Sequence, residues 1–206
     1  MDHAQAQSQD LFDVLVVGAG PAGLMAAEQA ARAGIRVAVA EAMPSPARKF
    51  LMAGKSGLNL TKAEDPDAFL QHFDAIAPLK PILSEFGPAE VIGFAEGLGL
   101  KVFTGSTGRV FPTRMKASPL LRAWLVRLDA LGVTLLRHHR WIGPLTTHAQ
   151  HLFDTPKGNV TLTAEALILA LGGASWARLG SDGAWHTPVA AAGVPIIPVQ
   201  ASNVGM

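Results

Sequence analysis

The sequence predicts an α/β fold with a parallel sheet, on three observations. An apolar run at 11–17 is followed by a helical pattern and then by a second apolar run at 35–40. The joins are short, as in a right-handed parallel crossover. A further apolar strand at 166–171 extends the sheet. We therefore expect a parallel sheet with helices on both faces.

The first strand, helix and second strand can each be justified from the residues. Residues 11–17 are nearly all apolar and include three valines, which suits a strand buried on both faces. Leu24, Ala27 and Ala31 then recur at helical spacing. Gly34 provides a helix stop before residues 35–40. The order strand, helix, strand follows.

The rest of the chain predicts shorter elements. Residues 141–163 alternate weakly around a turn at 154–159, which predicts a small antiparallel excursion from the sheet. Ser118 and Pro119 predict the N-cap and first residue of a helix that ends near Gly132. The other expected elements are helices at 66–73 and 88–98, two strands within 101–111, and a strand at 133–136.

Composition and charge exclude several classes of function. Hydrophobic residues make up 49% of the 206 residues, which supports a packed globule. The net charge of +1 gives no broad field that favours polyanions, so we expect neither a nucleic-acid nor a membrane partner. The absence of cysteine excludes thiolate chemistry. No secretory signal or long apolar segment is visible, so a cytoplasmic location is expected.

A glycine motif separates the first strand from the first helix. Gly18, Gly20 and Gly23 have the spacing GxGxxG, in which the glycines give a tight turn, close approach of a pyrophosphate and close helix packing. Pro21 fits the first turn of the helix, where its missing N–H costs no hydrogen bond. The motif predicts that a dinucleotide binds at the helix N-terminus.

An acidic residue at the end of the second strand supports this site. Glu41 follows Gly23 by eighteen residues, close to the spacing at which a carboxylate accepts from ribose hydroxyls. The same pattern serves FAD and NAD. A long glycine-rich stretch at 53–59 and a second glycine pair, Gly172 and Gly173, fit a ligand longer than its ADP half, which favours FAD.

Four stretches carry a resemblance to a known family. They are residues 13–23, residues 47–61, residues 108–112 with 116–121, and residues 170–175 with 180–183. On these, the chain resembles the BaiN-like flavoproteins, or aminoacetone oxidase family of FAD-dependent oxidoreductases. It resembles a subgroup without cysteine, because most of that family has a Gly-Gly-Gly-Arg-Cys-Asn run where this chain has Ala-Gly-Lys-Ser-Gly-Leu-Asn.

The resemblance implies a Rossmann-like FAD-binding domain and further contacts on the flavin side. It implies that Lys49 and Asn59 contact this side of FAD, although a solvated lysine and a loop-holding asparagine are equally open readings. The expected cofactor-binding residues are Gly18, Gly20, Pro21, Ala22, Gly23, Glu41, Ala42, Lys49, Asn59, Ala170, Gly172 and Gly173. No catalytic acid or base and no metal site can be named.

The resemblance also implies a domain order and a function. We expect a polar tail at 1–10, an FAD-binding domain at 11–193 and, at 194–206, the start of a truncated inserted domain. The expected function is an FAD-dependent oxidoreductase that acts on a small-molecule substrate and is linked to NAD(P)H. An incomplete FAD-binding module and an NAD-dependent enzyme remain open.

Overall fold

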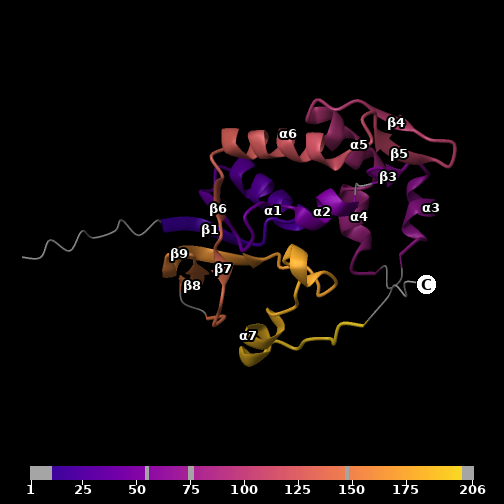
Figure 1. Ribbon diagram of the computed structural model, residues 1–206. Coiled ribbons are helices and arrows are strands. Elements are labelled where there is room, and N and C mark those ends of the chain that lie inside the picture. Colours follow the sequence, from indigo (N-terminus) through magenta and orange to yellow (C-terminus); the bar gives the residue numbers. More distant parts are fainter. Residues whose placement is uncertain (1–10, 54–55, 74–76, 147–148, 201–206) are drawn as a thin grey trace, which may run out of the picture. The chain divides into compact units, whose positions relative to one another are not determined.

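The computed structural model describes residues 11–53, 56–73, 77–146 and 149–200 (Figure 1). These residues form two compact units. The first unit combines the described residues up to Lys49 with those from Leu128 onward, and the second runs from Phe50 to Arg127. The domain boundaries expected at 10 and 193 stay a prediction.

The first unit is built on a six-stranded sheet in the order β6-β2-β1-β9-β8-β7. Strands β6, β2, β1 and β9 are parallel, whereas β8 and β7 are antiparallel to their neighbours. The bounds are β1 (Leu11–Val17), β2 (Val37–Glu41), β6 (Thr134–Arg137), β7 (Arg140–Trp141), β8 (Gln150–Thr155) and β9 (Gly158–Leu169). The predicted α/β fold with an antiparallel excursion is confirmed.

Helices cover both faces of this sheet, as expected. Alternation along β2 sends Val37 and Val39 to one face and Ala38 and Ala40 to the other, and all four are buried. The alanine face belongs to a hydrophobic cluster that contains Val189 of α7 (His186–Ala191). Helix α1 (Pro21–Arg32) contacts β1, β2 and β9, and Figure 1 shows α1 and α7 on opposite sides of the sheet.

Strand β9 differs from the prediction, which placed a separate strand at 166–171. One strand runs without a break from Gly158 to Leu169. It pairs with β8 along its first half and with β1 along its second, and Thr163 has a partner on each side. Because pairing passes from one edge to the other at Thr163 without a gap, the excursion and the parallel strand form one element.

The second unit contains a three-stranded antiparallel sheet, in the order β3-β5-β4, and several helices. The strands are β3 (Thr61–Lys62), β4 (Val102–Thr104) and β5 (Arg109–Pro112). Its helices are α3 (Pro66–Leu70), α4 (Lys80–Glu85) and α5 (Pro88–Gly97), whereas α2 (Arg48–Ala53) and α6 (Ala117–Ala130) each cross the boundary between the units. No helix in the described ranges is long and apolar enough to cross a membrane.

The predicted cap of α6 is wrong by two residues. The helix begins at Ala117, so Ser118 and Pro119 lie inside its first turn. Proline is tolerated there because the first-turn N–H groups have no partner within the helix. Helices α2, α4 and α7 were not predicted, because each has only six residues and shows too little periodicity for recognition.

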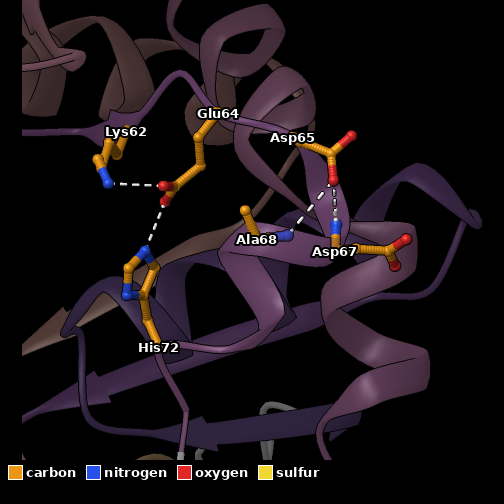
Figure 2. Close-up of polar contacts among 6 residues, drawn as sticks. All are labelled: Lys62, Glu64, Asp65, Asp67, Ala68 and His72. Atoms are coloured by element: carbon orange, nitrogen blue, oxygen red, sulfur yellow. Dashed lines mark hydrogen bonds and ion pairs between the residues drawn. The ribbon is translucent and has the colours of Figure 1, made fainter.

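A carboxylate in the second unit joins two cationic or basic side chains (Figure 2). Lys62 Nζ lies 2.6 Å from Glu64 Oε2, and His72 Nε2 lies 2.9 Å from Glu64 Oε1. The next residue, Asp65, caps α3 by accepting from the N–H groups of Asp67 and Ala68. These contacts fix the chain between β3 and α3.

We expect Glu64 to make the stability of the chain depend on acidic pH. The hydrogen bond from Lys62 lowers the pKa of Glu64 below its ordinary value of 4.5. A lowered pKa means stabilisation that is present above about pH 4.5 and is lost as pH falls through the lower pKa of the folded chain. Thermal midpoints measured against pH should therefore fall less steeply in acid for Glu64→Gln than for the wild type. Glu85→Gln, at an exposed carboxylate of α4, is the control, and equal slopes in all three proteins would contradict the role of Glu64.

Candidate cofactor site

Three strand ends meet at one edge of the first unit's sheet. The Gly18 N–H donates to the Ala40 carbonyl at 2.8 Å, and the Ala170 N–H donates to the Val17 carbonyl at 2.8 Å. The residues that follow β1, β2 and β9 are therefore held side by side. Because ligands of open α/β sheets bind outside the carboxyl ends of the strands, this edge is the candidate site.

Two of the three motif glycines are required by close packing. Gly18 has φ of +103°, and a Cβ there would collide with the Ala170 carbonyl oxygen. A Cβ on Gly23 would collide with the Gly18 carbonyl oxygen and would lie 3.2 Å from the Ala170 Cβ. These glycines bring α1, β1 and the end of β9 into contact, as predicted for the turn and the packing position.

Gly20 behaves differently, because a Cβ there would meet nothing within 4 Å. Gly20 is the N-cap of α1 and has an ordinary extended conformation, with φ of −76° and ψ of 177°. Its side-chain position is therefore open space in front of the helix N-terminus, where Pro21 and Ala22 are exposed. An anion placed there would face backbone N–H groups and the positive end of the helix dipole. The position of Gly20 therefore leaves room for an anionic group such as a pyrophosphate.

Glu41 has a structural role that the sequence did not reveal. Its Oε2 accepts from the Ala19 N–H at 2.9 Å, and its Oε1 accepts from the Met43 N–H at 2.8 Å. The carboxylate thus fixes the glycine turn on one side and the segment after Ala42 on the other. Because each carboxylate oxygen can accept two hydrogen bonds and here accepts one, acceptor capacity remains for ribose hydroxyls.

Lys49 contacts the loop that follows β9. Its Nζ donates to Ser175 Oγ at 2.8 Å and to Ser181 Oγ at 3.2 Å. Ser181 is buried, and its hydroxyl donates to the Gly173 carbonyl at 2.7 Å. This chain connects Lys49 to the Gly172–Gly173 backbone. Sequence reasoning missed both serines, although they lie within the stretches 170–175 and 180–183 of the resemblance.

The glycine pair after β9 supplies accessible backbone at the same edge. Gly172 has φ of +70°, which favours glycine, and a Cβ on Gly173 would meet nothing within 4 Å. Asn59 is exposed but belongs to the second unit, so its predicted flavin contact stays a prediction. The described ranges contain no group of three or more His, Asp or Glu side chains that could hold a metal ion.

The comparison with protein families decides the ancestry of the chain. The HI0933-like protein Rossmann domain matches residues 12–205, nearly the whole sequence. The chain belongs to the HI0933-like family. The narrower resemblance to the BaiN-like subgroup stays a prediction.

Two curated relatives share the family's sequence pattern at low identity. The ribosomal RNA dihydrouridine synthase of Escherichia coli (strain K12) is 25% identical over 197 residues, which are 94% of this chain and 47% of the relative. The protein of the same name from Haemophilus influenzae is 25% identical over 194 residues, which are 92% of this chain and 47% of the relative. The chain spans about half the length of these relatives.

Solved structures share the fold. A flavocytochrome c3 fumarate reductase is similar with a TM-score of 0.63 and 20% identity, covering 82% of this chain and 34% of that one. THI4 of Thermovibrio ammonificans has a TM-score of 0.57 and 17% identity, covering 91% of this chain and 65% of that one. Glycine oxidase of Geobacillus kaustophilus has a TM-score of 0.54 and 19% identity, covering 84% of this chain and 58% of that one. At this identity the likeness establishes the Rossmann fold alone.

The geometry of the turn predicts stability effects of different size at Gly18 and Gly20. Gly18→Ala should destabilise the chain by about 2 kcal/mol or more, because it combines a positive φ with a backbone collision. Gly20→Ala should change stability by less than about 1 kcal/mol, because its Cβ enters open space. Urea unfolding of both variants checks this, and equal losses would show that Gly20 is also packed.

Proposed function

We propose that this protein is an FAD-binding oxidoreductase whose described first unit holds the ADP half of the cofactor. The observation that carries this proposal is the open position at Gly20, between a helix N-terminus and the fixed carboxylate of Glu41. A turn that only joined strand to helix would have no need of a glycine there. Membership of the HI0933-like family supports the same conclusion.

The residues divide the binding of FAD between two ends. The N–H groups at the start of α1, around Pro21 and Ala22, would hold the pyrophosphate, and Glu41 with Ala42 would hold the adenosine ribose. On the other side, the Lys49 ammonium and the Gly172–Gly173 backbone would contact the flavin half. Lys49 brings a positive charge that stabilises an anionic ligand, and its two serine contacts fix where that charge lies.

Bound FAD supplies hydride or electron transfer, whereas the protein orients the reactants and excludes water. For this reason the lack of a recognised acid–base pair does not argue against catalysis. We infer that electrons come from NAD(P)H and that the substrate is a small molecule. An FAD-binding module without turnover is the alternative, and it predicts flavin that is bound but not reduced by NAD(P)H.

A second candidate substrate is a uracil ring in RNA. It is favoured by one observation, the name shared by the two curated relatives, ribosomal RNA dihydrouridine synthase. Formation of dihydrouridine adds a hydride and a proton across the C5–C6 double bond of uracil. In this proposal NAD(P)H would reduce FAD, and the reduced FAD would give the hydride to uracil. The reaction is compatible with the same FAD site.

The proposal is tested by reconstitution with FAD. Wild-type protein should retain FAD through gel filtration, whereas Gly20→Val should lose it, since the side chain would fill the space proposed for the pyrophosphate. Thermal unfolding without FAD should be similar for both proteins. Failure of the folded wild type to bind FAD, or normal binding by Gly20→Val, would contradict the proposal.

Substitution of Glu41 separates its two roles. Glu41→Ala should weaken FAD binding by about 1.5 to 3 kcal/mol, the scale of a hydrogen bond to a charged group. It should also lower the free energy of unfolding without FAD, because two backbone N–H groups lose their acceptor. Isothermal titration with FAD and with ADP, beside urea unfolding, distinguishes these effects. Loss of stability with unchanged affinity would leave Glu41 only its structural role.

A further inference from the structure

We propose that one face of the β3-β5-β4 sheet binds single-stranded RNA. This face, called here the outer face, consists of Lys62, Lys101, Phe103, Arg109, Phe111 and Thr113. All six residues belong to the second unit. The choice of RNA over DNA rests on the second candidate substrate proposed above, whereas the argument for a single-stranded nucleic acid rests on the face itself.

Strand register places these side chains on one side of the sheet. Phe103 pairs with Phe111, and Lys62 pairs with Arg109, so members of each pair point to the same face. Arg109 and Phe111 are two residues apart on β5, so their side chains also point to this face. The pairing continues past β4, because the Thr113 N–H donates to the Lys101 carbonyl at 2.9 Å. On the opposite face, Val110 and Pro112 are fully buried.

The outer face carries exposed positive charge. Lys101 and Arg109 are both exposed. Lys62 is neutralised locally, because Glu64 accepts its hydrogen bond at 2.6 Å (Figure 2). We therefore assign contacts with phosphate groups to Lys101 and Arg109, whose charges suit a phosphodiester backbone.

The segment that contains β4 and β5 has no acidic residue, unlike the sequence that follows β3. Residues 97–128 contain six cations and no Asp or Glu. The six are Lys101, Arg109, Arg114, Lys116, Arg122 and Arg127. An acidic phosphate chain that approached this segment would therefore meet no repelling carboxylate from the segment itself.

Aromatic rings lie between the exposed cations. Phe103 is 44% exposed, and its ring stacks on that of Phe111 with centroids 5.8 Å apart and an interplanar angle of 29°. Phe111 is half-buried, and Gly105 lies beside its ring, since a Cβ on Gly105 would be 3.7 Å from Cε2. An exposed aromatic ring flanked by cations is the combination by which proteins bind unpaired bases and their phosphates.

These features favour a single strand over other anionic partners. A duplex hides its bases in the stack and would not use Phe103, whereas unstacked bases lie flat on an aromatic ring. An acidic peptide would use Lys101 and Arg109 but would gain little from a flat aromatic surface. The aromatic pair therefore decides between the two classes of partner.

Fluorescence anisotropy with the full chain tests the proposal. The probes are a labelled 12-nucleotide uridine-rich RNA, the DNA strand of matching sequence, the RNA in a duplex and an oligoglutamate peptide. We expect the single-stranded RNA to bind most tightly. Phe103→Leu, which keeps an apolar side chain but removes the ring, should weaken RNA binding about tenfold. The double variant Lys101→Ser, Arg109→Ser should lower the slope of log K against log salt by about 1.4, since each lost phosphate contact contributes ~0.7.

Matched controls keep this result interpretable. Arg122→Ala removes an exposed cation of the same acid-free segment from α6, and it should leave RNA affinity within about twofold. Equal binding of oligoglutamate, equal weakening by Arg122→Ala, or no effect of Phe103→Leu would overturn the proposal. Tighter binding of DNA than of RNA would overturn the choice of RNA.

The FAD site is tested separately. RNA binding is measured with and without FAD, and Gly20→Val should lose FAD while it keeps RNA. If FAD binds and RNA does not, the inference fails and the proposed FAD site stands. If RNA binds and FAD does not, the proposed function fails and the RNA face stands.

Discussion

The close contact among α1, β1 and the end of β9 is the constraint on which the candidate site depends. It exists because Gly18 and Gly23 have no side chains, so that the helix can approach the Ala170 backbone. The same approach brings the helix N-terminus to the edge where β2 ends with Glu41. Gly20 lies between these two glycines in the sequence, and the space beside its Cα is empty. Two motif glycines are thus closely packed, and the third faces open space.

Polar contacts extend this edge to segments that are distant in sequence. Glu41 connects the turn to the start of segment 42–49, and Lys49 connects the end of that segment to the loop after β9. Ser181 completes the connection through the Gly173 carbonyl. A buried hydroxyl that joins an ammonium group to a carbonyl is hard to replace, because loss of one partner leaves another polar group unpaired. The same groups that would bind a cofactor therefore also keep the edge in one conformation.

Local pattern predicted the first β-α-β unit and the glycine turn, because a continuous apolar run, a helical period and fixed spacings are all short-range signals. It could not show that β9 is a single strand, since this depends on partners on both edges, β8 and β1. It also missed Ser175 and Ser181, which lie 126 and 132 residues from Lys49 along the chain. Contacts of such separation follow from topology, and no spacing in the sequence encodes them.

The net charge of the whole chain differs from the local charge on one of its surfaces. The net charge of +1 led to the expectation that nucleic acid is not a partner, which is the opposite of the RNA-binding face proposed above. Yet residues 50–96 contain seven acids and three cations, whereas residues 97–127 contain six cations and no acid. Electrostatic potential in physiological salt decays over about 8 Å, so a ligand responds to nearby charges rather than to the sum over the chain. The alternation of β4 and β5 then places Lys101 and Arg109 beside Phe103 on one face. The relevant quantity for binding is therefore the charge on that face, and it is positive.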